Sequence, residues 1–265
     1  MSESLIVAGI DVGSECVKAV VLDRDKQILG RSTVQATGYF QMRIREAMDN
    51  ALDDAQYVAA DLAQVCVTGF GARCAEITGA VALRDASCHG RGAFHHFAEP
   101  LTVVDLGSRD PTVIQVDDHG ERTDTRSLRK CAVGVGTFLT FAARHLDVHP
   151  TRLMELAAAA ERSVPVSSYC SVFAESALLE QLRDGATREE LALGAMESVA
   201  ERVIEIGHLR EPVVVTGGVP EYFPGVVAAL ERMSGLRVRV APQPIQAAAL
   251  GAALTALDLA EQAGS

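Results

Sequence analysis

The sequence is poor in aromatic residues and in positive charge. It contains no tryptophan, and only 5% of its 265 residues are aromatic, so the core must consist mainly of Ala, Val, Leu and Ile. It has 24 Lys and Arg against 35 Asp and Glu, a formal net charge of −11. Proteins that bind nucleic acid or anionic membranes present a basic surface. The composition therefore argues against both of these classes.

Long apolar runs and targeting signals are also missing. No run approaches the roughly 18 apolar residues that span a bilayer. The first residues lack the basic stretch of a signal peptide and carry Glu3 and Asp11, so we expect a cytoplasmic protein. Six cysteines in a reducing compartment are not expected to form disulfides. No Cys-x-x-Cys pair occurs, which argues against a zinc or iron–sulfur site within one segment.

The clearest positive feature is an internal repeat. Residues 9–33 and 103–127 both read as a strand, an Asp-x-Gly-Ser turn, a second strand and a polar turn. The repeat pairs Asp11 with Asp105, Gly13 with Gly107 and Ser14 with Ser108. Two unrelated hairpins could align this well by chance, but the identical turns favour a duplicated unit.

The rest of the chain alternates short strands with helices, which predicts an α/β fold. Expected strands are 64–68, 212–216 and 236–240, and segment 73–98 is expected to be partly helical. Helices are expected at 41–56, where an apolar stripe runs from Met42 to Leu52, and at 131–146, 150–160, 173–183, 188–209, 220–232 and 245–262. We place the domain boundary at 99/100, giving domains 1–99 and 100–265, with the last helix free to pack back on the first domain.

The two Asp-x-Gly-Ser turns suggest phosphate binding. Gly lets the backbone approach a ligand closely, and exposed N–H groups can then cradle phosphate oxygens. Gly13, Ser14, Gly107 and Ser108 are therefore candidate phosphate contacts. An Asp cannot face phosphate directly without repulsion, so Asp11 and Asp105 are candidates for holding Mg²⁺ or orienting the attacking water. A third glycine segment at Gly217 and Gly218 follows a buried strand and suits contact with adenosine.

Two cysteines lie in distinctive surroundings. Cys131 precedes Gly134 and Gly136 at an expected helix start, and Cys170 precedes another expected helix. A helix N-terminus lowers the pKa of a thiol and favours metal binding. Two thiolates are half of a four-cysteine iron–sulfur site, which a second chain would complete. From the residues alone, two ordinary buried cysteines remain an alternative. Gly134 and Gly136 could serve the nucleotide or the cluster.

Several segments together resemble the BadF/BadG/BcrA/BcrD ATPase family. They are GIDVGS at 9–14, TGFG at 68–71, SCHGRGA at 87–93, VVDLGSRD at 103–110, KCAVGVGTFL at 130–139, SSYCSVFAES at 167–176, VVTGGV at 214–219 and ALGAAL at 249–254. The resemblance implies a duplicated fold of the actin, hsp70 and sugar-kinase type, with ATP or ADP and Mg²⁺ in a cleft between two subdomains. It further implies a [4Fe–4S] cluster shared by two subunits, with Cys131 and Cys170 as ligands.

The resemblance also implies a function in electron transfer. Family members hydrolyse ATP to deliver low-potential electrons, received from a donor such as ferredoxin, to a partner acyl-CoA reductase or dehydratase. The second ATPase subunit is an identical chain or a paralogue. Neither nucleic acid nor a membrane span is implied.

Departures from the family pattern guide the choice of subfamily. Arg109 stands where activators have Gln, Glu15 where Thr is common, and Leu128-Arg129 precedes Lys130 where Asn-Asp is usual. We therefore favour a benzoyl-CoA reductase ATPase subunit over a homodimeric activator of a 2-hydroxyacyl-CoA dehydratase. An iron-free small-molecule kinase, or a regulatory nucleotide-binding module of the same fold, stays open.

Other residues receive plain structural interpretations. Lys18 is expected to be a solvated strand residue, and His89 to be structural. The remaining cysteines are expected to be small core residues: Cys16, Cys66, Cys74 and Cys88.

Overall fold

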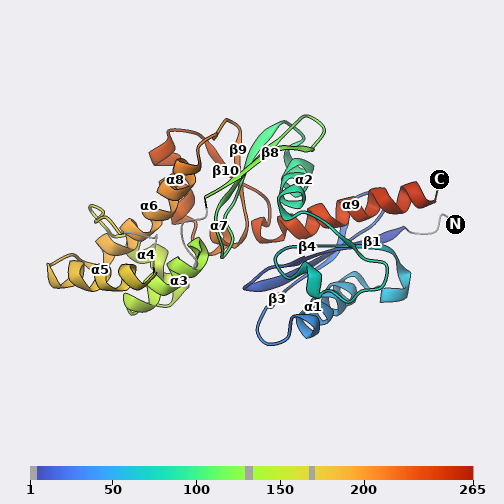
Figure 1. The fold of residues 1–265 in the computed structure, drawn as a ribbon, viewed down its shortest axis with the longest axis horizontal. Helices are drawn as coiled ribbons and strands as arrows, with labels where there is room; N and C mark the ends of the chain where they lie inside the picture. The colour runs from blue at the N-terminus through green and yellow to red at the C-terminus, as the bar shows by residue number, and fades with distance from the viewer. Residues whose placement is uncertain (1–4, 129–133, 167–170, 265) are drawn as a thin grey trace. The chain divides into compact units, whose positions relative to one another are not determined.

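The computed structural model describes residues 5–128, 134–166 and 171–264. The chain divides into two compact units, and each is considered by itself (Figure 1). Unit 1 comprises residues 1–100, 116–123 and 246–265, and unit 2 comprises 101–115 and 124–245. Each unit is thus assembled from separate stretches of the sequence.

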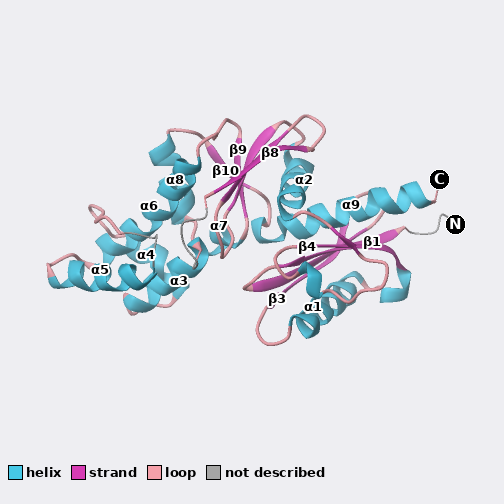
Figure 2. Ribbon diagram, viewed as in Figure 1, coloured by secondary structure: helices cyan, strands magenta, loops and turns pink. Residues whose placement is uncertain are grey.

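Unit 1 is a five-stranded sheet covered by helices on both faces (Figure 2). Its strands are β1 (Ile6–Val12), β2 (Cys16–Leu22), β3 (Ile28–Gln35), β4 (Leu62–Thr68) and β5 (Val81–Ala82). One face packs on α1 (Phe40–Ala55) and the other on α9 (Ala247–Ala263), which also packs on α2 (Asp85–Phe97). The β1 glycine, Gly9, lets α9 lie directly on the sheet, because a Cβ there would collide with the Ala253 backbone.

Unit 2 contains a second five-stranded sheet and a larger set of helices. Its strands are β6 (Leu101–Asp105), β7 (Thr112–Val116), β8 (Arg122–Ser127), β9 (Val213–Thr216) and β10 (Val238–Val240). Its helices are α3 (Val135–His145), α4 (Leu153–Ala158), α5 (Ser171–Arg183), α6 (Arg188–Ile206), α7 (Gly218–Tyr222) and α8 (Gly225–Ser234). Side chains from α3, α6 and α8 form one buried cluster with those of β6 and β9.

The two sheets have the same strand order, as the repeat predicts. The order is β3-β2-β1-β4-β5 in unit 1 and β8-β7-β6-β9-β10, when read in the matching direction, in unit 2. The central parallel pairs also share their register, since Asp11 lies opposite Thr68 and Asp105 opposite Thr216. The duplication is therefore present in the tertiary structure as well as in the sequence.

Three expectations about the helices and strands need correction. The helix expected over 220–232 is broken into α7 and α8, because Pro224 has no N–H to continue a helix and lies at the N-cap of α8. Segment 73–98 contains the short strand β5 before α2 begins at Asp85. Met42 is 63% exposed and does not belong to the buried stripe of α1, which begins at Ile44.

Among the described residues, no helix is both long enough and apolar enough to cross a bilayer.

Candidate nucleotide site

The first Asp-x-Gly-Ser turn joins β1 to β2 in a tight hairpin. The Gly13 N–H donates to the Cys16 carbonyl at 3.0 Å, and a Cβ at Gly13 would lie only 2.8 Å from that carbonyl oxygen. Ser14 follows at the tip and is partly exposed. Asp11, Gly13 and Ser14 thus belong to one hairpin at the carboxyl end of β1.

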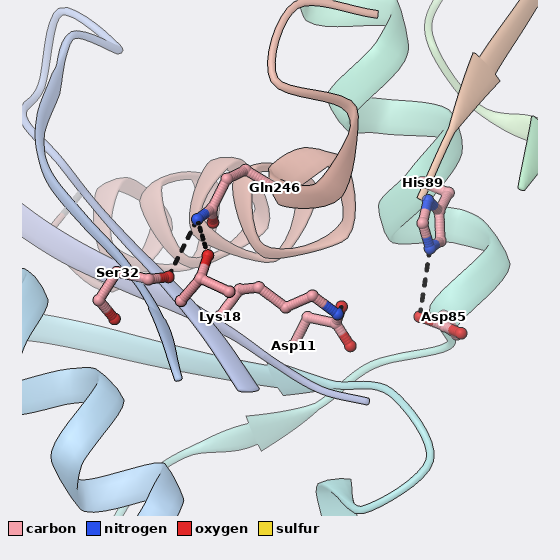
Figure 3. Close-up of polar contacts among 7 residues, drawn as sticks. Asp11, Lys18, Ser32, Asp85, His89 and Gln246 are labelled. Carbon is pink, nitrogen blue, oxygen red and sulfur yellow. Dashed lines mark hydrogen bonds and ion pairs between the residues drawn. The ribbon is translucent and has the colours of Figure 1, made fainter. Parts of the chain in front are cut away.

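The Asp11 carboxylate is occupied by a lysine (Figure 3). Lys18 lies opposite Asp11 in the β1–β2 pair and donates from Nζ to Oδ2 at 2.7 Å, with the two side chains 12% and 7% exposed. Burial by itself would lower the pKa of Lys18, but the Asp11 carboxylate outweighs burial and raises it. The expectation of a solvated Lys18 is therefore wrong, and the charge is buried and paired.

A Thr-Gly dipeptide at the end of β4 completes the environment of Asp11. Gly69 has φ +90°, and a Cβ there would collide with Asp11 Oδ1 and the Val12 backbone. The Gly71 N–H donates to the Val12 carbonyl at 2.8 Å, so the segment after β4 is bound to the end of β1. Glycine at position 69 is needed both for its backbone angle and for this close approach.

Unit 2 contains the same arrangement around Asp105. Gly217 follows Thr216, has φ +92°, and would place a Cβ 2.8 Å from Asp105 Oδ1. The Val219 N–H donates to the Leu106 carbonyl at 2.8 Å, as Gly71 does to Val12 in unit 1. The repeat pairs Lys18 with Thr112, so the strand after the second turn carries no equivalent cation. The two aspartates consequently differ in their electrostatic surroundings.

The second turn is held by the segment that precedes α3. The Val135 N–H donates to the Arg109 carbonyl at 3.0 Å. Gly134, with φ +75°, would bring a Cβ into the Ser108 carbonyl, and a Cβ at Gly136 would lie 2.8 Å from the Gly107 carbonyl oxygen. The close approach that Gly134 and Gly136 permit is therefore to the backbone of the second turn.

Gly107 itself is left open by the protein. A Cβ at Gly107 would meet only Asp105 Oδ1, at an ordinary 3.8 Å. Gly107 and Ser108 are both partly exposed. Because packing does not demand glycine at position 107, the bare backbone there is available to a ligand.

The other titratable residues near Asp11 lie on α2. His89 is buried and its Nε2 lies 3.8 Å from Asp85 Oδ1, one turn away on the same helix (Figure 3). Burial raises the pKa of Cys88 to about 12 and that of Cys66 to about 11, so both thiols are neutral core groups, as expected. Cys74 is exposed, which corrects the expectation of a core residue, because it lies in a surface turn after β4.

Unit 1 brings together Asp11, Gly13 and Ser14, and unit 2 brings together the predicted residues Asp105, Gly107, Ser108, Gly134, Gly136, Gly217 and Gly218. Cys131 and Cys170 lie outside the described residues. The sequence reasoning assigned no role to Lys18 or to Gly69. A Thr-Gly pair after a buried strand occurs in both halves of the sequence, and that signal could have identified Gly69.

Comparison with known proteins agrees with this duplicated arrangement. Residues 8–256 match the model of the BadF/BadG/BcrA/BcrD ATPase family. The chain belongs to this family. It is 36% identical to the (R)-2-hydroxyglutaryl-CoA dehydratase activating ATPase of Acidaminococcus fermentans, over 96% of this chain and 97% of the relative. It is 35% identical to an activator of lactoyl-CoA dehydratase from Anaerotignum propionicum, over 96% and 98% of the two chains.

A member of the other subfamily matches less well. A subunit of the benzoyl-CoA reductase of Thauera aromatica is 29% identical to this family member, over 81% of this chain and 78% of the relative. The relatives with the higher identities are thus dehydratase activators, whereas the departures in the sequence favoured the reductase subunit.

Solved structures place the family member in its fold class. The A. fermentans (R)-2-hydroxyglutaryl-CoA dehydratase component A covers 97% of this chain and all of its own, at 34% identity and a TM-score of 0.88. The Clostridium difficile 2-hydroxyisocaproyl-CoA dehydratase activator, with bound ADPNP, covers 98% and 97% at 29% identity and a TM-score of 0.89. A Streptomyces griseus ROK glucokinase shares the fold alone, covering 97% and 99% at 15% identity and a TM-score of 0.59. The actin and sugar-kinase type of fold expected from the sequence is confirmed.

Proposed function

We propose that this protein is an ATP-hydrolysing activator that delivers electrons to a partner of the 2-hydroxyacyl-CoA dehydratase type. The observation that carries the proposal is the match, over nearly the whole of both chains, to two dehydratase activators at 35% and 36% identity. The ADPNP bound to a structural neighbour with a TM-score of 0.89 supports nucleotide binding.

The residues of the two turns suit phosphate binding in different ways. At the second turn, the open backbone of Gly107 and the Ser108 hydroxyl can approach phosphate oxygens, and Asp105 can hold Mg²⁺ through water. At the first turn, Gly13 and Ser14 supply equivalent groups. Lys18 neutralises Asp11 there, so that the carboxylate next to the turn does not repel phosphate.

Cys131 and Cys170 are the proposed ligands of a [4Fe–4S] cluster, two from each of two chains. Thiolate sulfur is the donor that such clusters require, and the cluster would supply a one-electron carrier. The described part of the Cys131 segment supports a link to the nucleotide. Val135 bonds to the Arg109 carbonyl, and the Thr137 hydroxyl donates to the Ser108 carbonyl at 3.3 Å. A movement of the second turn on ATP hydrolysis would therefore pull on the residues that follow Cys131.

Anaerobic purification and metal analysis test this proposal. The wild-type protein is expected to be brown, to carry iron and sulfide, and to hydrolyse ATP. Cys131→Ala and Cys170→Ala are each expected to lose the cluster EPR signal, while the matched Cys74→Ala, at an exposed cysteine, keeps it. A full-intensity signal in either of the first two variants would contradict the ligand assignment.

A benzoyl-CoA reductase ATPase subunit is the second candidate. Arg109 in place of the Gln of activators is the observation that favours it. Co-purification distinguishes the two candidates, since an activator pairs with an identical chain and a reductase subunit with a paralogue. If Arg109 limits hydrolysis, Arg109→Gln should raise the kcat for ATP without changing the iron content.

A further inference from the structure

Gly218 presents a bare backbone that the fold does not require. Its neighbour Gly217 must be glycine, because φ is +92° and a Cβ would lie 2.6 Å from the Leu106 carbonyl oxygen. Gly218 has no such constraint. Its φ lies outside the left-handed region, and a Cβ would meet only Ile245 and Tyr222 side-chain carbons, at 3.9–4.0 Å. Those are ordinary van der Waals distances, so an alanine would fit.

The duplicated motif of unit 1 supports the same conclusion. The segment 68–71 has the same Thr-Gly start as 216–219, and the same hydrogen bond back to the strand that carries the aspartate. In that copy the position of Gly218 is taken by Phe70, a large side chain that is 62% exposed. The backbone of this motif therefore tolerates bulk. The absence of a side chain at Gly218 points to a ligand that needs the space.

The side chains beside Gly218 define the chemistry of that ligand. Tyr222, at the end of α7, is 49% exposed, and Ile245 is partly exposed. The Gly217 N–H donates to the Pro244 carbonyl at 2.8 Å, which fixes the segment carrying Ile245 beside the glycines. A flat backbone between an aromatic ring and an aliphatic side chain suits an uncharged planar ring, and it does not suit a phosphate.

We propose that Gly218, Tyr222 and Ile245 form the surface that binds the nucleobase, with the Tyr222 ring stacking on the base. The proposal rests on the proposed ATP binding and deepens it, because it identifies the side chains that distinguish a nucleotide from a bare polyphosphate. Stacking of a base on an aromatic side chain accounts for roughly a 10- to 100-fold change in affinity. Tyr222 therefore sets the affinity for ATP but has no part in the hydrolysis step.

Binding of two probes to four proteins tests the proposal. The dissociation constants of MgATP and of Mg-tripolyphosphate are measured by calorimetry for wild type, Tyr222→Ala, Tyr222→Phe and Gly218→Ala. Tyr39→Ala is the matched control, because Tyr39 is 79% exposed and lies in unit 1. We expect Tyr222→Ala to weaken ATP binding roughly 10- to 100-fold and to raise the KM for ATP with an unchanged kcat. Tripolyphosphate binding should stay unchanged.

The conservative variants complete the expected pattern. Tyr222→Phe should bind ATP like the wild type, and Gly218→Ala should weaken ATP binding at an unchanged melting temperature. Equal ATP affinity in wild type and Tyr222→Ala would overturn this inference while leaving the proposed function standing. So would an equal loss of both probes, which indicates a structural role. A wild-type protein that binds no ATP would overturn both proposals.

Discussion

At the scale of single residues, the most informative pair is Lys18 and Asp11. Opposite charges on neighbouring strands have been taken out of water together, and each leaves the other uncompensated if it is removed. The raised pKa of Lys18 means that the folded state binds its proton more tightly than the unfolded state. The contribution of this group to stability is thus complete at neutral pH, and it is lost only as the pH rises through the raised pKa.

Replacing Lys18 tests the importance of this pair. We expect Lys18→Met to lower the free energy of unfolding by about 3–5 kcal/mol at pH 7, because the Asp11 carboxylate would be buried without a counter-charge. Urea denaturation of wild type and variant measures the difference. Lys26→Met, at an exposed lysine of the following turn, is the matched control and should change stability little. The gap between wild type and Lys18→Met should narrow above the ordinary lysine pKa of 10.5. A near-neutral Lys18→Met would show that the ion pair is not needed.

At the scale of elements, the functional unit is a hairpin joined to a Thr-Gly turn. The turn supplies the ligand-facing backbone, while the glycine after the neighbouring parallel strand lets the carboxylate lie against the main chain. The same device occurs in both units with nearly the same φ at Gly69 and Gly217. Such agreement between unrelated side-chain environments indicates that the motif is maintained by its backbone geometry.

Two glycines of unit 1 separate the effect of backbone angle from that of close approach. Gly79 has φ +77° with nothing near its missing Cβ, so Gly79→Ala should cost about 1–2 kcal/mol, the penalty of a left-handed backbone. Gly69→Ala carries that penalty and also forces a methyl group against Asp11. The overpacking should cost roughly a further 1–3 kcal/mol. Thermal or urea unfolding of the two variants measures the difference. Equal losses would mean that the chain relaxes around position 69 without cost.

At the scale of the whole molecule, the chain order does not follow the units. Unit 1 begins with residues 1–100 but is completed by α9, from the far end of the sequence. Cys66, Cys88 and the inner face of α9 form one buried cluster, and Arg91 of α2 pairs with Asp258 of α9. The first hundred residues therefore lack one face of their own core until the last helix has been made.

Truncation of the C-terminus tests this dependence. A chain ending at residue 246 exposes the apolar face of β1 and β4, and it should lose cooperative unfolding of unit 1 and bind the dye ANS. A chain ending at residue 260 removes the exposed residues 261–264 and the terminal Ser265, and it should unfold like the full-length protein. Circular dichroism melting curves of the two truncated chains distinguish these outcomes. A cooperative, dye-free melt of the shorter chain would show that α9 is dispensable.

Much of this could be predicted from local sequence. Alternating apolar strands, the two Asp-x-Gly-Ser turns and the helix of α1 are encoded within short windows, because turn chemistry and side-chain periodicity act locally. The duplicated fold and the family were therefore accessible from the residues. The helix break at Pro224 was also readable, since proline acts through its own missing N–H.

The tertiary structure alone decided which side chains meet. Lys18 reads as a solvated strand residue because its neighbours in sequence do not reveal its partner seven positions earlier across the hairpin. Gly69 and Gly218 each look like ordinary loop glycines until the strand beside them is known, and only then does one prove to be required by packing and the other not. Burial and pairing depend on contacts between distant segments, and no local pattern specifies them.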